Sequence, residues 1–404
     1  MLFDVLLSPL TAFFTSNCSN IDKESGSKKL FFEDFCRKIF FSIIYQVASL
    51  RSLVTELETN ELSTKIGFEA TPFSTLKDAF TRFDARHFKQ LYESTLNCFD
   101  WIKVKCFEEL GVLCIVDGSL FPTLIQMEWA DYKRNTAACK LHLCFELNRM
   151  IPTSFIVGSG NSSERDFLVS IAQKAVTYIA DRGYFSFDLG RQLVEKQAFF
   201  LIRIKSNLLF EVDNVLSITH TVPLPACFFN ICDQIIHFTN DDSQNSYRLV
   251  RFSIGLKTFF ICTNRLDLNT LQVIMLYSFR WQVELMFKFL KCSLHGIHLF
   301  NNTENGVQVQ FYLWLSMALL QLRFKQVCLF VEQNNLLKIN DLHEKNYSIE
   351  LFISYFGGCS ETFAANIAKM LYSAWKLSKK FLLLLKNSIT KIPNFALFDK
   401  FSAA

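Results

Sequence analysis

Five side chains capable of polar chemistry recur along one segment of the chain at spacings of three and four residues. They are Tyr277, Arg280, Glu284, Lys288 and Lys291. At about 100° per residue, these positions share a stripe about 80° wide on an ideal helix, and the other faces carry mostly Phe, Leu, Met and Val. A helix this apolar is largely buried, so its polar stripe is expected to line a cleft or a ligand.

The residue types of this stripe suit a phosphodiester backbone held beside a metal ion. Arginine and lysine neutralise phosphates, tyrosine donates to a phosphate oxygen, and Trp281, which flanks the stripe, can stack on a base. The alternative is an amphipathic helix in which Arg280–Glu284 and Glu284–Lys288 pairs stabilise an exposed face. In that case Trp281 belongs to the core.

Two aspartates follow short apolar runs of similar character. Residues 111–116 lead to Asp117 in the sequence Val-Asp-Gly-Ser, and residues 178–180 lead to Asp181 in Ala-Asp-Arg-Gly-Tyr. Each run predicts a buried strand that ends where the chain turns. A carboxylate at such a place can hold a metal ion, or it can simply be a polar turn residue.

The spacing Tyr277-x2-Arg280-x3-Glu284-x6-Lys291 resembles the Tyr-Arg-Glu-Lys signature of bacterial insertion-sequence transposases of the DDE type, in the insertion-sequence-4 group. The resemblance is specific over about 110–300 and weak over 1–105 and beyond 300. A spaced motif of this kind needs support from its context, which the two aspartates supply.

Asp117 resembles the first aspartate of that family and Asp181 the second, and Glu284 follows in the right order. The spacings are 64 and 103 residues, and the longer gap contains a β-rich stretch at about 207–263. The resemblance therefore implies an α/β fold in which an RNase H-like catalytic core is interrupted by a β-strand insertion, with helical N- and C-terminal regions.

The same resemblance implies a division into three domains. Residues 1–105 would form a helical region that helps to bind DNA ends. Residues 106–300 would form the DDE catalytic domain, with its β insertion at about 207–263. Residues 301–404 would form a helical region that supports dimerisation.

The chemistry implied is metal-dependent cut-and-paste transposition: hydrolysis at the ends of an element, then attack of the freed 3′-hydroxyl on target DNA. Asp117, Asp181 and Glu284 would be the catalytic residues and would hold two Mg²⁺ or Mn²⁺ ions through hard oxygen ligands. The residues that bind DNA would be Tyr277, Arg280, Trp281, Lys288 and Lys291. The partners would be double-stranded DNA, namely the terminal inverted repeats and the target, and a second copy of the chain in a homodimer.

Hydrophobic periodicity predicts the remaining elements. Helices are expected at 30–62, 74–82, 84–97, 164–178, 186–197 and 270–292, and mainly helical structure from 306 onward. Strands are expected at 137–147, 151–157 and 199–205, and in the β-rich stretch at 215–221, 234–239, 247–254 and 258–262. Two short helices with a tight join, 74–82 and 84–97, are either a helix-turn-helix or ordinary helical packing.

Composition limits the classes of protein to which the chain can belong. The chain has 404 residues, 50% of them hydrophobic, with 44 Phe and a net charge of +4. This excludes a disordered, collagen-like or disulfide-framework protein, and it supplies enough apolar material for a core, which the Phe residues are expected to fill. No apolar run is long enough to cross a bilayer, and the N-terminus lacks the basic start of a signal peptide. Thirteen scattered Cys fit a reducing, cytoplasmic setting.

Several other polar residues have no assigned role. Arg203 and Lys205 alternate on a predicted strand and face either DNA or solvent. Glu164, Asp166 and Asp188 are interpreted as helix-start or surface residues, and His142, His295 and His298 as hydrogen-bonded polar groups rather than metal ligands. The lysines of the stretch 369–404 are interpreted as a solvated helix face.

Three rival functions remain open at this stage. One is a catalytically inactive transposase descendant that binds DNA. Another is a metal-dependent nuclease that cuts without joining. The third is a structural helical protein in which the matches arise by chance.

Overall fold

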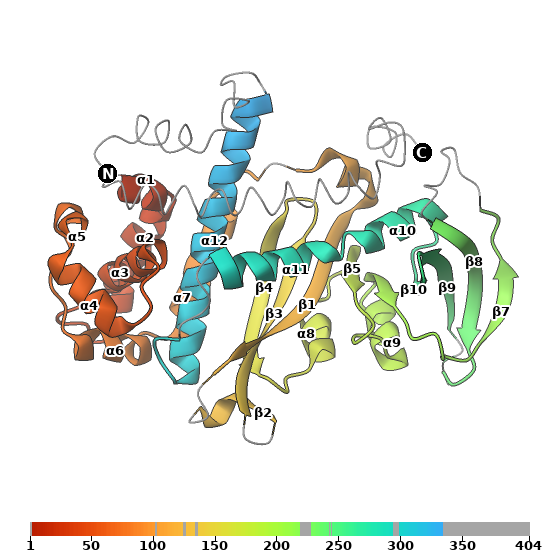
Figure 1. Ribbon diagram of the computed structural model, residues 1–404, viewed down its shortest axis with the longest axis horizontal. Coiled ribbons are helices and arrows are strands. Elements are labelled where there is room, and N and C mark those ends of the chain that lie inside the picture. Colours follow the sequence, from red (N-terminus) through yellow and green to blue (C-terminus); the bar gives the residue numbers. More distant parts are fainter. Residues whose placement is uncertain are drawn as a thin grey trace. The chain divides into compact units, whose positions relative to one another are not determined.

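The computed structural model describes most of the chain up to residue 333 (Figure 1). The described residues are 2–101, 103–123, 127–133, 136–218, 228–241, 243, 245–293 and 299–333. The chain divides into two compact units. The first consists of residues 1–102, 121–139 and 287–377, and the second of residues 103–120, 140–286 and 378–404.

The first unit is mainly helical. Its helices are α1 (Leu2–Leu7), α2 (Thr11–Glu24), α3 (Phe32–Tyr45), α4 (Leu50–Thr59), α5 (Glu61–Ile66), α6 (Phe73–Arg82), α7 (Ala85–Asn97) and α12 (Glu304–Gln333). The single helix expected at 30–62 is wrong, because the chain leaves helical geometry at Gln46, which has φ 59° and begins the turn into α4. The pair expected at 74–82 and 84–97 is confirmed, and Asp84 caps α7 by accepting from the Arg86 N–H.

Phenylalanine fills the core of this unit, as its abundance predicts. Phe32, Phe35, Phe83 and Phe88 have no exposed surface and contact one another edge-on or tilted. The start of α12 is fastened to the α6–α7 junction by Asn305, whose amide donates to the carbonyls of Phe80 and Phe83 and accepts from the Ala85 N–H.

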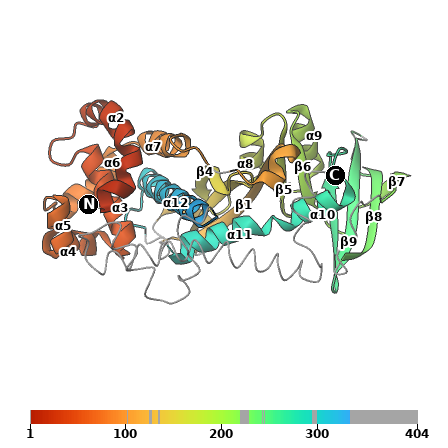
Figure 2. The same ribbon diagram turned by 90° about the horizontal axis from the view of Figure 1, so that it is seen from above.

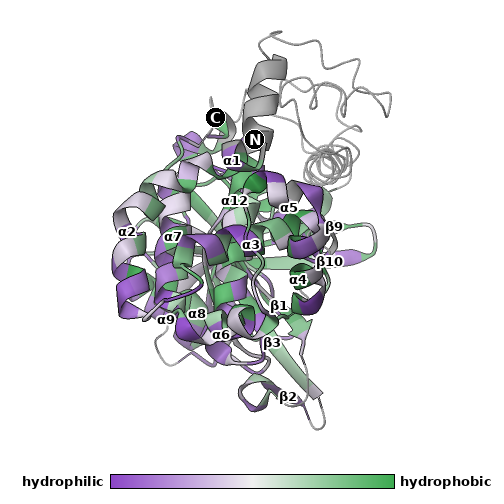
Figure 3. Ribbon diagram, turned by 90° about the vertical axis from the view of Figure 1, so that its left-hand side faces the viewer, coloured by the Kyte–Doolittle hydropathy of each residue, from purple (hydrophilic) through white to green (hydrophobic). Residues whose placement is uncertain are grey.

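Helix α12 is apolar on every side as far as its described side chains extend. Figure 3 shows its hydrophobic colouring beside the more hydrophilic α2. Val307, Leu313 and Leu319 point in different directions around the helix, and none has exposed surface. A helix that is hydrophobic all round is buried, and α12 accordingly packs against α7 and α3.

The second unit is built on a mixed sheet with strand order β3-β1-β5-β6-β10-β9-β8-β7, in which β4 pairs with β3. Its strands are β1 (Val112–Pro122), β3 (Thr136–Glu146), β4 (Ile151–Ser159), β5 (Val176–Ala180), β6 (Phe199–Arg203), β7 (Phe210–Val215), β8 (Phe228–Phe238), β9 (Ser246–Ile254) and β10 (Lys257–Thr263). A short strand of the first unit, β2 (Asp131–Lys133), pairs with the beginning of β3.

The parallel part of this sheet sets the positions of the two aspartates. β1 and β5 run parallel with Ile115 opposite Ile179, and β5 also runs parallel to β6. Asp117 and Asp181 lie two residues beyond that pair, so both reach the same edge and the same face of the sheet. Asp181 follows β5 as expected. The turn expected at Asp117 is wrong, because β1 continues through it to Pro122.

Helices cover the two faces of the sheet differently. α8 (Glu164–Ile171) and α9 (Phe187–Glu195) lie on one face and α10 (Thr270–Ser278) on the other (Figure 2). The α8–α9 face holds a cluster that includes Val116, Tyr178, Phe200, Phe167 and Leu189. Because alternate strand residues face opposite ways, the aspartates lie on the side that α10 covers.

Three further expectations need correction. The helix expected at 164–178 ends at Ile171, because residues from Val176 onward must pair with β1 and β6. The strand expected at 215–221 lies earlier, at Phe210–Val215, and residues 219–227 lie outside the described part. The other three strands of the stretch are confirmed as one antiparallel series from β8 to β10.

The long helix expected at 270–292 is not continuous. α10 ends at Ser278, α11 spans Trp281–Lys288, and a π-helical turn follows at Phe289–Ser293 (Figure 1). At the junction the Arg280 N–H donates to the Tyr277 carbonyl three residues back, which tightens the backbone into a turn. Arg280 therefore lies between two helices rather than within one.

No helix among the described residues is long and apolar enough to span a membrane. The lysine-rich stretch 369–404 lies outside the described residues.

Candidate active site

Arg280 lies among the carboxylates that the sequence singled out. Its Nη2 is 2.6 Å from Oε1 of Glu284, one helical turn onward, and its Nη1 is 4.0 Å from Oδ2 of Asp117 at the sheet edge. The Arg280 side chain is only 14% exposed, so this guanidinium is largely removed from water. The predicted Arg280–Glu284 pair is therefore confirmed, but it faces the sheet.

Asp181 is held from the opposite side by a tyrosine and a second arginine. The Tyr277 hydroxyl donates to Asp181 Oδ1 at 3.2 Å, and Nη1 of Arg203 is 4.0 Å from the same oxygen. The Arg203 guanidinium lies 4.7 Å from the ring centroid of Phe259, a cation–π contact that fixes its direction. Arg203 thus faces Asp181, and whether it contacts DNA stays a prediction.

Burial dominates the electrostatics of this site. Burial raises the pKa of Asp117 to about 6, and the nearby charges of Glu164 and Glu284 raise it further, against the lowering effects of the Gly118 N–H and Arg280. For Arg280, burial lowers the pKa, but the hydrogen bond to Glu284 and the charge of Asp181 outweigh it, so that the pKa is raised overall. The site thus places partly exposed carboxylates around a largely buried Arg280, which stays charged.

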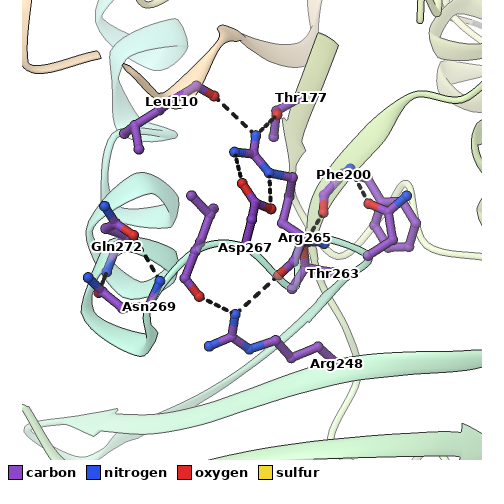
Figure 4. Close-up of polar contacts among 11 residues, drawn as sticks. Leu110, Thr177, Phe200, Arg248, Thr263, Arg265, Asp267, Asn269 and Gln272 are labelled. Atoms are coloured by element: carbon purple, nitrogen blue, oxygen red, sulfur yellow. Dashed lines mark hydrogen bonds and ion pairs between the residues drawn. The ribbon is translucent and has the colours of Figure 1, made fainter. Parts of the chain in front are cut away.

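A polar network holds the loop before α10, the helix that carries Tyr277 (Figure 4). Arg265 pairs with Asp267 at 2.7 Å and donates to the Leu110 carbonyl, two residues before β1. Arg248 from β9 donates to the carbonyl of Arg265 and forms a buried pair with Asp233 at 2.6 Å. Asn269 and Gln272 then form a reciprocal capping box, which fixes the first turn of α10.

The sequence analysis did not assign Glu164 or its partner Lys140 to the site, although Glu164 lies near the aspartates. Glu164, interpreted from the sequence as a helix-start residue, contributes to the field at Asp117 and pairs with Lys140 at 2.7 Å. The sequence did contain a signal, because Gly118 and Gly183 follow the two aspartates closely, and both lie against the Glu164 carboxylate.

The remaining predicted DNA-binding residues are less closely tied to this site. Trp281 opens α11 and is 48% exposed, which argues against a core role. Lys288 and Lys291 belong to the other compact unit, where Lys288 is exposed and the Lys291 ammonium lies 4.6 Å from the Phe121 ring centroid. His295 and His298 lie outside the described residues.

The oxygen ligands of this site suit a hard divalent cation, but the described side chains do not lie close enough together to share one. Asp117, Asp181 and Glu284 offer only oxygen ligands, as Mg²⁺ and Mn²⁺ prefer. Among the described residues, no three His, Cys, Asp or Glu side chains converge closely enough to hold a metal ion. The Arg280 guanidinium lies next to two of these carboxylates, 2.6 Å from Glu284 and 4.0 Å from Asp117.

Comparison with known proteins finds relatives of the segment that contains these residues. A family model described as "Transposase DDE domain" matches residues 108–320. A protein named "Putative transposase y4zB" from Sinorhizobium fredii is 26% identical over 210 residues, which is 51% of this chain and 58% of that protein. A protein from Geobacillus stearothermophilus named "Probable transposase for insertion sequence element IS5377" is 23% identical over 188 residues, 46% of this chain and 49% of its own length. The chain thus spans about half the length of each of these relatives.

Proposed function

The chain belongs to the DDE transposase domain family of insertion sequences, and we propose that it catalyses metal-dependent cleavage and strand transfer of an insertion sequence by cut-and-paste transposition. The observation that carries the proposal is the gathering of Asp117, Glu284 and Asp181 around Arg280 and Tyr277. These residues come from β1, the end of β5, α10, α11 and the junction between the two helices, and the contacts join positions up to 163 residues apart.

Asp117, Asp181 and Glu284 would hold two Mg²⁺ or Mn²⁺ ions. Bound there, the ions would supply an activated hydroxyl nucleophile and stabilise the leaving oxygen. The raised pKa of Asp117 supports this role, because a partly buried carboxylate near Glu164 and Glu284 gains from a nearby cation. Without the ions, the Arg280 guanidinium would neutralise the charges of Glu284 and Asp117.

The basic and aromatic residues would position the DNA. Arg280 and Tyr277 would contact the phosphate backbone next to the carboxylates, because each has a donor group already directed to the site. Trp281, with half its surface exposed, would stack on a base. Lys288 and Lys291 would neutralise further phosphates along the strand.

The regions outside the matched domain receive roles by analogy with the family. The N-terminal helices, among them the α6–α7 pair, would recognise the inverted repeats. The C-terminal region would support a homodimer that brings two ends together. The protein would work in the cytoplasm, bound to the nucleoid when it holds DNA.

The test is incubation of the purified protein with a plasmid that carries its coding locus and flanking DNA, in Mg²⁺ or in EDTA. Wild-type protein should excise or join DNA at defined ends in Mg²⁺ alone, and Asp181→Asn should abolish this while end binding persists. Asp188→Asn is the matched control, because it removes the same charge from an exposed position seven residues away.

Three other outcomes would reject the proposal. Cutting without joined products would show a nuclease. Specific retention of the flanks without cutting would show an inactive descendant that binds DNA. Neither cutting nor retention would reject both the proposed catalysis and the proposed recognition of these ends.

A further inference from the structure

Helix α10 is fastened to the sheet near both of its ends. The hydroxyl of Thr270, its first residue, donates to Oδ2 of Asp233 on β8 at 2.7 Å. The hydroxyl of Tyr277, in its last turn, donates to Oδ1 of Asp181 at 3.2 Å. Thr270 and Tyr277 are seven positions apart, close to two full turns, so their side chains leave the same face of the helix. The helix therefore has two anchor points, and one of them belongs to the candidate site.

Asp233 is a rigid anchor, because it is shielded from water and both of its oxygens accept hydrogen bonds. Its side chain has no exposed surface, and that of its partner Arg248 is 4% exposed. Arg248 Nε donates to Oδ1 of Asp233 at 2.9 Å, and Nη2 donates to Oδ2 at 2.6 Å. Charge-assisted, bidentate bonds of this kind are short and strong away from water. Thr270 therefore donates to an acceptor that is already held by β9.

The same arginine also holds the chain that leads into α10. Nη1 of Arg248 donates to the carbonyls of Arg265 and Leu268, and Figure 4 shows the guanidinium directed at this loop. Both the loop before α10 and the first residue of the helix are thus attached to β8 and β9. These two strands lie within the β-rich stretch 207–263.

The other end of α10 is held less firmly. The helix ends at Ser278, directly after Tyr277, and the backbone then tightens into the turn at Arg280. The 3.2 Å bond from Tyr277 is longer than the usual range for a hydroxyl donor, about 2.5–3.0 Å. A small rotation or slide of α10 would therefore break it. The Asp181 side chain is 43% exposed, so it depends on such contacts for its orientation.

We propose that Asp233 is a positioning residue for the candidate site. By holding Thr270, it fixes the rotation and the axial position of α10, and thereby brings the Tyr277 hydroxyl to Asp181. The β-rich stretch thus supports catalysis by orienting a helix, because β8 and β9 supply both anchoring side chains. This inference rests on the proposed function, since the orientation of Asp181 affects catalysis only if the chain cleaves DNA.

The experiment removes the anchor at Thr270 and measures plasmid cleavage by the full chain in Mg²⁺. Thr270→Val keeps the branched shape and loses the hydroxyl. Its kcat should fall at least about tenfold, because displacement of an orienting group costs up to about a hundredfold. Its KM for DNA should change little, and Thr270→Ser should recover most of the rate. Thr153→Val is the matched control: it makes the same substitution on β4, where the hydroxyl contacts the Cys144 carbonyl at 3.4 Å, and it should cleave as wild type does.

A double-mutant cycle with Tyr277→Phe tests whether Thr270 acts through the tyrosine. If it does, Thr270→Val should add little to the loss of kcat in Tyr277→Phe, because the hydroxyl that it displaces is already absent. Losses that multiply would show that Thr270 acts elsewhere. Equal cleavage by Thr270→Val and Thr153→Val, or a loss that Thr270→Ser does not restore, would also overturn the positioning role.

The same cycle, measured by urea denaturation in EDTA without DNA, separates this inference from the proposed function. If α10 moves as one body, its two anchors are coupled, and the double variant should lose less unfolding free energy than the sum of the single losses. Additive losses would reject the anchoring whether or not the protein cuts DNA. If wild type does not cleave and the losses are not additive, the proposed function is rejected, while the fastening of Tyr277 to Asp181 through Thr270 is retained.

Discussion

The hydroxyl of Tyr277 donates a 3.2 Å hydrogen bond to Oδ1 of Asp181, 96 residues earlier in the chain. The contact joins the last turn of α10 to the residue that follows β5. The Tyr277 ring also lies 6.3 Å, centroid to centroid, from Phe259 on β10, which in turn contacts the Arg203 guanidinium. One aromatic cluster thus fixes both polar groups that reach Asp181.

Tyr277→Phe should keep the position of the ring and lose only its hydrogen bond. The free energy of unfolding is expected to fall by about 1 kcal/mol, the net value of one such bond. Cleavage of DNA should fall more strongly, because Asp181 loses a group that orients it. Urea denaturation measures the first effect and plasmid cleavage the second. A stability loss above about 3 kcal/mol would mean that the ring had moved.

Asp117 should make the metal-free protein less stable as pH rises. Its pKa is about 6 in the folded protein against 3.8 for the ordinary side chain. The folded state therefore binds more protons between these values, and stability falls as pH rises through that window. Asp117→Asn should flatten this dependence and add at most about 3 kcal/mol at pH 7 in EDTA.

The control for this prediction is Asp188→Asn, an exposed position. It should change the free energy of unfolding by less than about 0.5 kcal/mol at any pH. Chemical denaturation from pH 4 to pH 8 makes the comparison. If the free energy of unfolding of Asp117→Asn depends on pH as that of wild type does, the Asp117 carboxylate is already ionised at low pH. Burial would then not raise its pKa.

Arg280→Met should turn the carboxylates into a stronger cation site. The guanidinium now lies 2.6 Å from Glu284 and 4.0 Å from Asp117, so its removal leaves their charge uncompensated. In EDTA the variant should melt below wild type, and MgCl₂ should raise its melting temperature by more than it raises that of wild type. Arg251→Met, an exposed arginine on β9, is the matched control. An equal response to MgCl₂ in both variants would contradict competition between Arg280 and the cation.

Lys291→Ala should weaken DNA binding and reduce its dependence on salt. Loss of one phosphate contact is expected to lower the slope of log K against log [NaCl] by about 0.9. Lys174→Ala, exposed just before β5, should leave the slope unchanged. The measurement is fluorescence anisotropy with duplexes from the native flanks. A full wild-type slope in Lys291→Ala would show that this lysine does not reach DNA.

Arg248→Met should destabilise the fold strongly. Asp233 and Arg248 are 1% and 3% exposed, and their pairing also fixes the carbonyls that precede α10. Breaking one partner of such a pair costs about 3–5 kcal/mol, because the other charge stays buried alone. The double variant Arg248→Met with Asp233→Leu should recover much of this loss in urea denaturation. A single variant that loses less than 1 kcal/mol would show that water reaches Asp233.

The sequence predicted the site where local spacing and strand polarity determine it. Asp181 could be placed because a short apolar run has one plausible end. Glu284 could be placed because Arg280, four residues earlier, lies on the same face of the predicted helix. The break at Arg280 could not be predicted, since the residues around it favour a continuous helix, and the turn depends on tertiary contacts of α10. The same holds for Asp117, where β1 continues because a neighbouring strand pairs with it.

Glu164 shows a different limit. Its sequence context is that of an ordinary capped helix, with Ser163 accepting from the Asp166 N–H. Only the three-dimensional approach of α8 to two glycines places its carboxylate beside the aspartates. The available signal in the sequence was a glycine close to each of the two aspartates. It indicates that another group packs closely there, but not which residue supplies that group.

The residues of the candidate site are also added to the nascent chain in a fixed order. Both aspartates are made before the strands β6 to β10, whereas Glu284 and Arg280 belong to segments that follow the last strand. On the proposed function, a ribosome must therefore finish the whole sheet before the nascent chain can cut DNA. A stop codon or frameshift upstream of residue 284 would leave an inert fragment, and never an unregulated nuclease.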